Sequence, residues 1–213
     1  MKELTSVKKK RDNKLGFFDA DSRELAEDGS LDFRPRVRPI ADKLNKLYSI
    51  VEMDQAVLVF NTCCSGKMLQ PDSKDNVLFV PLDMSETNWK KKIKEYRLFY
   101  LEKRKSFNPV TDAGCNVIDA FSDNANGSLL IKELDVDEWV VFGNGLDFCV
   151  DNAVKSLLKH GCKVTFLSDV MISSAAGYGN SGTEESRKST YENWIRMGAA
   201  GQTFERFLAD HRF

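Results

Sequence analysis

Histidine is scarce in this sequence: His160 and His211 are the only two among 213 residues. A Ser-His-Asp triad or a histidine-rich zinc site is therefore hard to build. The five cysteines are odd in number and contain no C-x-x-C pair, which favours free thiols in a reducing compartment over a disulfide framework. No apolar run approaches the roughly 20 residues of a membrane span, and the N-terminus lacks the apolar core of a secretory signal. We therefore expect a cytoplasmic protein.

The charge of the chain is nearly balanced. Its 31 Lys and Arg against 32 Asp and Glu leave a formal net charge of −1, so we expect neither nucleic acid nor a membrane surface as a partner. Basic side chains gather within residues 1–14, which we interpret as a flexible tail. With 42% hydrophobic and 30% charged residues and no linker in view, residues 15–213 are expected to form a single domain.

Short apolar runs alternate along the chain with helical stripes. The runs that are typical of buried strands are Leu15–Asp19, Ala56–Phe60, Leu98–Leu101, Trp139–Phe142 and Lys163–Leu167. Helical spacing is found over Ile40–Val51, Asn88–Tyr96, Asn116–Phe121, Val150–Lys159, Glu184–Met197 and Thr203–His211. We read residues 126–128 as a turn. This alternation predicts an α/β fold, a Rossmann-like doubly wound, mostly parallel sheet of about six strands with helices on both faces.

The segment 139–161 carries the strongest functional signal. An apolar strand is followed by Gly143 and Gly145 and then by an amphipathic helix whose first turn contains Cys149. Unpaired backbone N–H groups and the positive end of the helix dipole favour thiolate over thiol at such a position. The position suits a nucleophile, although a small buried cysteine is the commoner reason for this pattern.

Polar residues follow the predicted strands where ligands bind in doubly wound sheets, beyond the carboxyl ends. Asp19, Thr62 and Lys103 lie at such ends. The first and fourth of the predicted strands are neighbours in the common strand order, which would place Asp19 beside Cys149.

In such a site each group has a chemical role. Asp19 would take the thiol proton, and Lys103, with Lys105 as a rival, would hold that carboxylate. Backbone N–H groups of Gly145 and Cys149 would stabilise an oxyanion.

Several segments resemble one family. They are FFDADSREL (17–25), DGSL (28–31), KRKSF (103–107), GNGLDFCV (143–150) and VTFLSD (164–169). Together they resemble the isochorismatase-like cysteine hydrolases, which include nicotinamidases and N-carbamoylsarcosine amidases.

The resemblance implies an Asp19–Lys103–Cys149 triad that cleaves a small amide or carbamoyl C–N bond through a thioester. It implies an oxyanion hole after a cis peptide bond between Asn144 and Gly145. Members of the family usually form oligomers, so a homo-oligomer is expected. Asp21, Phe107 and Phe148 are the candidates to contact the small-molecule amide substrate.

The sequence departs from the family pattern at three places. Asp21 stands where the family usually has Gln, and Leu146 stands where it has Thr. Nicotinamidases carry an Asp-x-His metal segment after the second strand, but residues 60–65 read FNTCCS here. Two adjacent thiols lack the usual spacing of zinc ligands. We therefore predict no metal and no cofactor.

Two other functions remain open. DADS (19–22) after a strand also resembles the aspartate motif of haloacid dehalogenase-type phosphatases, in which Asp19 would be phosphorylated and magnesium required. The substitutions at Asp21, Thr62 and Leu146 could instead mark an inactive scaffold, because a fold alone does not prove activity.

Overall fold

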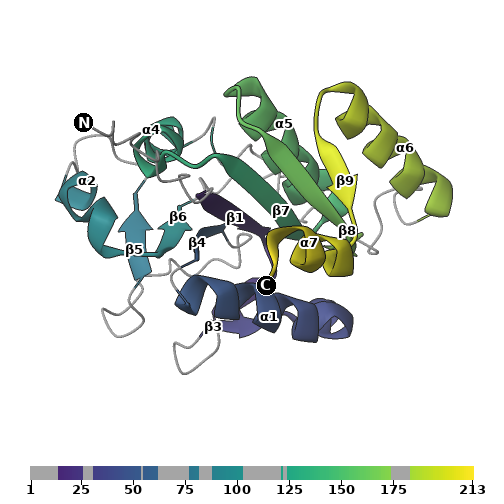
Figure 1. The fold of residues 1–213 in the computed structure, drawn as a ribbon, viewed down its shortest axis with the longest axis horizontal. Helices are drawn as coiled ribbons and strands as arrows, with labels where there is room; N and C mark the ends of the chain where they lie inside the picture. The colour runs from purple at the N-terminus through teal and green to yellow at the C-terminus, as the bar shows by residue number, and fades with distance from the viewer. Residues whose placement is uncertain are drawn as a thin grey trace, which may run out of the picture.

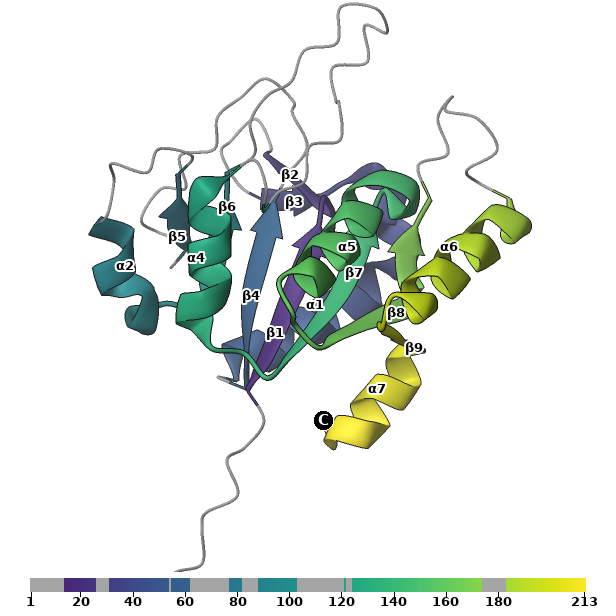
Figure 2. The same cartoon turned by 90° about the horizontal axis from the view of Figure 1, so that it is seen from above.

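The computed structural model describes residues 14–25, 31–53, 55–61, 77–81, 88–102, 121, 124–173 and 183–213. One parallel sheet runs through these segments, and Figure 2 shows its strands pointing the same way. Its seven strands are β1 (Leu15–Ala20), β4 (Ala56–Asn61), β5 (Val77–Val80), β6 (Leu98–Leu101), β7 (Glu138–Asn144), β8 (Val164–Ile172) and β9 (Ala200–Gln202). A separate antiparallel hairpin pairs β2 (Arg23–Leu25) with β3 (Leu31–Phe33).

The strand order is β5-β6-β4-β1-β7-β8-β9. From β1 the chain moves outward to β4 and then to the edge strand β5, and it comes back one place to form β6 between them. It then crosses to the other side of β1 with β7. Strand order therefore reverses between β1 and β7, and such a reversal opens a crevice at the carboxyl ends of the strands. The predicted doubly wound sheet is confirmed, as is the pairing of the Asp19 strand with the strand before Cys149.

The sheet has seven strands rather than the expected six or so because both edges are extended by short strands. These are β5 (Val77–Val80) and β9 (Ala200–Gln202). β9 has the sequence AGQ and is largely exposed, so it has none of the apolar run that marks a buried strand. Backbone pairing with β8 forms it, and pairing of this kind leaves little trace in side-chain pattern.

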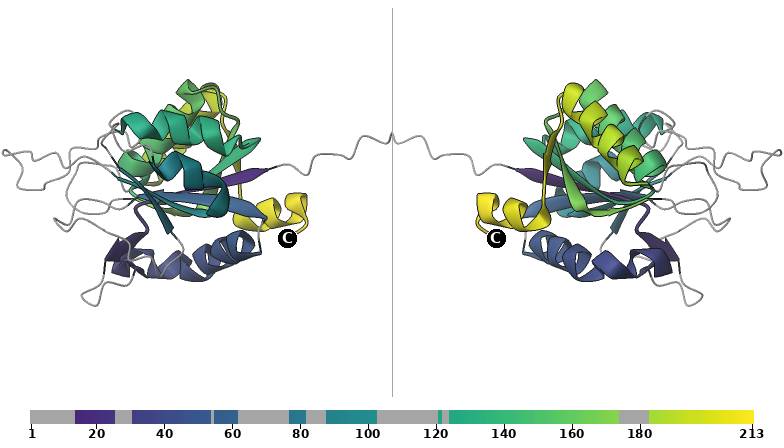
Figure 3. Two further views of the ribbon diagram at one scale, coloured as in Figure 1. Left: turned by 90° about the vertical axis from the view of Figure 1, so that its left-hand side faces the viewer. Right: turned by 90° about the vertical axis from the view of Figure 1, so that its right-hand side faces the viewer.

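Helices cover both faces of the sheet. They are η1 (Pro35–Ile40), α1 (Ala41–Glu52), α2 (Asn88–Lys92), η3 (Ile93–Glu95), α4 (Ala125–Leu134), η4 (Leu146–Val150), α5 (Asp151–Lys159), α6 (Glu184–Arg196) and α7 (Phe204–His211). α1 and α7 lie on one face, and α2, α4, α5 and α6 lie on the other (Figures 1 and 3). No helix in the described ranges is long and apolar enough to cross a membrane.

Consecutive residues of β1 face opposite helix layers. Phe17 belongs to the core that includes Leu44 and Leu47 of α1, whereas Phe18 belongs to the core that includes Val154 of α5. Every residue of β1 is buried. A strand covered on both faces must be apolar at every position, which is why the strands were legible in the sequence.

One local prediction is wrong. Residues 126–128 lie inside α4 and do not form a turn. The helix begins there because the Asn124 side chain accepts the N–H of Asn126 at 2.9 Å as an N-cap. Gly127 then allows close packing, since a Cβ at that position would lie 3.0 Å from Cα of Phe121. The helix expected over 116–121 falls outside the described residues except for Phe121.

Candidate active site

Buried polar side chains gather at the carboxyl ends of three adjacent strands, β4, β1 and β7. No more than 3% of any of them is exposed: Asp19, Asp21, Ser22, Asn61 and Asn144. Burying polar groups costs free energy, so a concentration of them at the reversal point of the sheet indicates a functional site. Asn61 was missed in the sequence, although it is the polar residue that ends an otherwise apolar strand.

A turn that contains Gly143 and Gly145 places Cys149 at the carboxyl ends of these strands. A Cβ at Gly143 would lie 2.2 Å from the Ala20 carbonyl oxygen, so only glycine lets β7 approach β1 this closely. Gly145 has a φ of 81°, and its carbonyl accepts the N–H groups of Phe148 and Val150. The chain therefore enters a π-helical turn, η4, before α5 begins. Cys149 is half-buried within that turn.

The expected cis peptide bond between Asn144 and Gly145 is not found, because all peptide bonds of the described residues are trans. The turn is made instead by the positive φ of Gly145, whose N–H donates to the Ile172 carbonyl at 2.9 Å. This hydrogen bond occupies the N–H that was expected to stabilise an oxyanion. An oxyanion role for Gly145 would require the bond to Ile172 to open, and it stays a prediction, as does that of Cys149.

The thiol of Cys149 donates to Oδ2 of Asp21 at 3.6 Å. In a continuous strand Asp21 would face the same side as Asp19, since side chains alternate with a period of two. Asp21 instead has a φ of 63°, a left-handed conformation that aspartate tolerates better than most residues. The turn ends β1 and directs the carboxylate to the helix layer that carries Cys149.

Asp19 contacts the opposite layer. Its Oδ2 accepts the Tyr48 hydroxyl of α1 at 2.5 Å, and the residue is completely buried. Burial raises the pKa of Asp19, and interactions with Ser22 and Tyr48 offset this only in part. The Arg23 guanidinium lies 3.9 Å from the centre of the Tyr48 ring, within cation–π range. The catalytic role predicted for Asp19 stays a prediction, whereas the carboxylate that contacts the thiol is that of Asp21.

The remaining predicted site residues have varied outcomes. Phe148 is half-buried beside Cys149 in η4. Four candidates lie outside the described residues: Thr62, Lys103, its alternative Lys105, and Phe107. Glu102, which precedes Lys103, directly follows β6, whose carboxyl end lies at the same edge of the sheet as that of β1.

The described residues do not fit a metal centre. They contain no group of three or more His, Cys, Asp or Glu side chains that could hold an ion. His160 follows the last residue of α5 and His211 ends α7, so neither lies in the turn that carries Cys149. The absence of a metal stays a prediction, because Cys63 and Cys64 fall outside the described residues.

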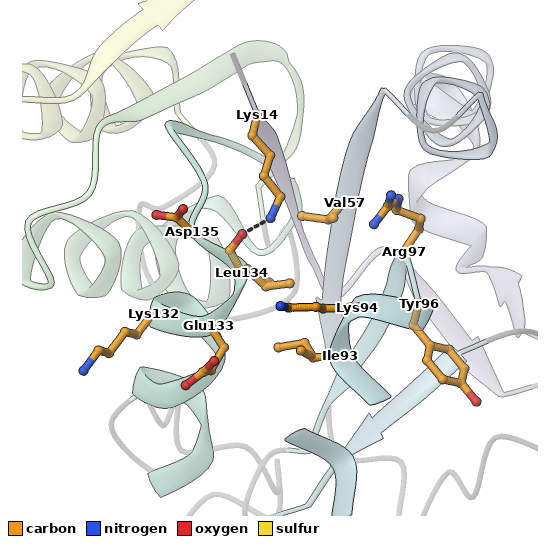
Figure 4. Close-up of a pocket in the computed structure, with 10 residues that line it drawn as sticks. All are labelled: Lys14, Val57, Ile93, Lys94, Tyr96, Arg97, Lys132, Glu133, Leu134 and Asp135. Atoms are coloured by element: carbon orange, nitrogen blue, oxygen red, sulfur yellow. Dashed lines mark hydrogen bonds between the residues drawn. The ribbon is translucent and has the colours of Figure 1, made fainter. Parts of the chain in front are cut away.

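Two cavities lie among the described residues, and Cys149 lines neither of them. The larger, about 640 Å³, has Lys14, Lys94 and Arg97 on its walls (Figure 4). Lys14 precedes β1 and Arg97 precedes β6, so this cavity lies at the amino ends of the strands. Lys14 is already used there, since its ammonium donates to the Leu134 carbonyl at the end of α4. The second cavity, about 360 Å³, lies between α5 and α6 and includes Asp147.

No protein-family model and no curated protein matches the sequence. Solved structures do match, and they define the class of fold. An isochorismatase-like hydrolase from Alkaliphilus metalliredigens aligns with a TM-score of 0.57 and 18% identity, over 94% of this chain and 97% of that one.

Two solved amidases align with this chain about equally well. The pyrazinamidase/nicotinamidase of Streptococcus mutans aligns with a TM-score of 0.54 and 17% identity, over 88% of this chain and 99% of its own. The pyrazinamidase of Pyrococcus horikoshii, solved in complex with zinc, has a TM-score of 0.54 and 12% identity, with 89% and 98% covered. The chain thus has the fold of isochorismatase-like hydrolases and nicotinamidases, as the sequence resemblance implied.

Proposed function

We propose that this protein is a cysteine hydrolase that cleaves a small amide or carbamoyl C–N bond through a thioester. The observation that carries the proposal is the contact between Cys149 Sγ and Asp21 Oδ2, 3.6 Å long, at the reversal point of the sheet. A thiol at the start of a helix, next to a buried carboxylate that can accept its proton, is the arrangement that activates a cysteine nucleophile. The amidase names of the fold neighbours support the same class of reaction.

In the first half of the reaction the Cys149 sulfur attacks the amide carbonyl carbon while Asp21 accepts the thiol proton. Collapse of the tetrahedral intermediate breaks the C–N bond, and the proton passes from Asp21 to the leaving nitrogen. In the second half water attacks the thioester and gives a proton to Asp21. The C–S bond breaks, the acid leaves, and the proton returns to the sulfur.

The resemblance assigns proton transfer to Asp19, and the contact favours Asp21. We propose Asp21 for that step because it touches the thiol, whereas the Asp19 carboxylate is bonded to Tyr48. Lys103 completes the site in this proposal by holding the carboxylates, with Lys105 as the alternative. No step in this proposal is routed through a metal.

The phosphatase alternative is disfavoured by the place of Asp19. A phosphorylated aspartate must meet both a magnesium ion and the phosphate of the substrate. Asp19 has 0% of its surface exposed and packs against a tyrosine. The inactive scaffold would have the same fold as the hydrolase but would not turn over an amide. The ammonia-release test below distinguishes the two.

The test is ammonia release from a panel of amides that includes nicotinamide and N-carbamoyl compounds. The wild-type protein should release ammonia from at least one, and Cys149→Ala should release none. Asp21→Asn should lose about 100-fold or more in rate, the usual contribution of a general acid–base, and more than Asp19→Asn loses.

Cys162→Ala is the matched control, because this half-buried thiol lies beyond the far end of α5. Its activity should equal that of the wild type. Full activity in Cys149→Ala would refute the mechanism, and a larger loss in Asp19→Asn than in Asp21→Asn would return proton transfer to Asp19.

A further inference from the structure

We propose that Arg34 is a positioning residue that holds the Asp21 carboxylate against the Cys149 thiol and offsets the one negative charge that the carboxylate and the thiolate share. The inference deepens the proposed function and rests on it, since it takes Cys149 as a reactive thiol. Arg34 belongs to none of the segments that carry the family resemblance, and nothing in its sequence context marked it.

The first observation is a buried ion pair. The Arg34 guanidinium lies 3.4 Å from Oδ1 of Asp21, with 14% and 5% of the two side chains exposed. The other carboxylate oxygen, Oδ2, accepts the Cys149 thiol. The two oxygens of one carboxylate thus connect a guanidinium to a thiol.

The second observation is that Arg34 is itself fixed to the segment after Asp21. Its backbone N–H donates to the Ser22 carbonyl at 3.0 Å, and its Nε donates to the Arg23 carbonyl at 3.3 Å. Arg34 also directly precedes η1, which begins at Pro35. Arg34 is therefore bonded to the segment after Asp21 through its backbone and its guanidinium, and the ion pair with Oδ1 restricts how the carboxylate can turn.

The charge argument explains why a cation is needed. A lone buried carboxylate beside a thiol would disfavour the thiolate by like-charge repulsion. When the proton passes from sulfur to Asp21, the negative charge passes to the thiolate, and a guanidinium that stays protonated offsets that charge in either place. The contacts among Arg34, Asp21 and Cys149 would thus support both the transfer of the thiol proton and the formation of the thiolate.

Three other charged residues near this unit, Asp19, Arg23 and Asp151, contact partners of their own. From the end of β1, Asp19 accepts the Tyr48 hydroxyl, and Arg23 of β2 lies over the Tyr48 ring. On the helix of the thiol, Asp151 pairs with Lys155 at 2.6 Å and accepts the Trp194 indole N–H at 2.7 Å. Asp147 is the remaining acid of η4, and it stays unchanged in every variant below.

The experiment measures the rate of Cys149 alkylation by iodoacetamide from pH 5 to pH 10, with the labelled peptide identified by mass spectrometry. In Arg34→Met the midpoint of the profile should rise by about one pH unit, which is roughly a tenfold slower reaction at pH 7. Arg34→Lys should restore most of the wild-type profile. Arg36→Met, which removes an exposed arginine from the same segment, should leave it unchanged.

A double variant tests whether Arg34 acts through Asp21. In the Asp21→Asn background the guanidinium still attracts the thiolate directly, so adding Arg34→Met should raise the midpoint there too. The rise should be smaller than in the wild-type background, because no carboxylate is left to be positioned and balanced. The proposal is overturned by an unchanged midpoint in Arg34→Met, or by the same shift in both backgrounds. If Arg34→Met does not fold, as judged by circular dichroism, Arg34→Gln carries the same comparison.

Alkylation of Cys149 needs no amide substrate, so its result is independent of the result of the ammonia-release test. A shifted midpoint without ammonia release from any amide would refute the proposed function and keep the role of Arg34. Ammonia release with an unchanged midpoint would do the reverse.

Discussion

The carboxylates of Asp19 and Asp21 contact opposite helix layers although only Ala20 separates them. Asp19 accepts the Tyr48 hydroxyl of α1, and Asp21 accepts the Cys149 thiol of η4. The φ of 63° at Asp21 breaks the alternation of the strand and causes this divergence. One acid is thereby enclosed in the core and the other faces the candidate nucleophile.

Cys149 should react with iodoacetamide faster than Cys162. Burial raises the pKa of the Cys162 thiol, which lowers its thiolate fraction at neutral pH, whereas Cys149 lies in the turn that starts a helix. We expect about a tenfold difference in rate at pH 7.5, read from the two peptides by mass spectrometry. Faster labelling of Cys162 would contradict the assignment of Cys149 as the reactive thiol.

Gly143→Ala should destabilise the fold severely. The new Cβ would lie 2.2 Å from the carbonyl oxygen of Ala20 at a φ of 125°, so β1 and β7 would have to separate. We expect a loss of about 3 kcal/mol or more in the free energy of unfolding. The control is Gly161→Ala, at a φ of 76° with nothing within 4 Å of its Cβ, which should cost only about 1 kcal/mol. Equal losses in urea denaturation would contradict the close approach of the two strands.

Asp19 should make the protein less stable as the pH rises above about 4. Because burial raises its folded pKa, the unfolded chain loses this proton first, near pH 3.9. Between that pH and the folded pKa the native state binds more protons, so the free energy of unfolding falls, by up to about 1.4 kcal/mol per pH unit. Asp19→Asn should remove this component, so its free energy of unfolding should rise relative to that of the wild type as the pH increases above about 4. A difference that does not change with pH would contradict the raised pKa.

Asp169 should have the opposite effect on the pH dependence of stability, because its carboxylate makes the protein more stable as the pH rises. Burial raises its pKa, but hydrogen bonds from Lys43 and from the Phe204 N–H outweigh this and lower the pKa overall. Its contribution is present above about pH 4, the unfolded value, and is lost as the pH falls through the lower folded pKa. Asp169→Asn should cost about 1 kcal/mol at pH 7, and the deficit should shrink in acid.

Asp210→Asn is the control for Asp169, since Asp210 pairs with Arg206 on the exposed surface of α7. It should cost about 0.5 kcal/mol or less. Chemical denaturation of both variants at pH 3 and pH 7 measures the comparison, and an Asp169 deficit that persists in acid would contradict it.

The sequence by itself determined the alternation of strands and helices and the place of Cys149. Both are local: a strand buried on both faces must be apolar throughout, and the glycine turn before Cys149 needs residues that permit positive φ. The helices with one apolar face, such as α1 and α5, were legible for the same reason. Three elements were not predicted, and of these only β9 has no apolar run and depends on backbone pairing. α4 and β5 bury apolar side chains, so their sequences LLIKEL and VLFV did contain a signal that was missed.

Only the tertiary structure decided which acid meets the thiol. Asp19 and Asp21 lie on either side of the last residue of one strand and have the same side-chain chemistry, so no local pattern distinguishes them. Tyr48 and Arg34 make the distinction, and they come from α1 and the segment before η1. Contacts between residues distant in sequence depend on how the layers pack around the reversal point between β1 and β7, and that packing places Asp21, held by Arg34, beside Cys149.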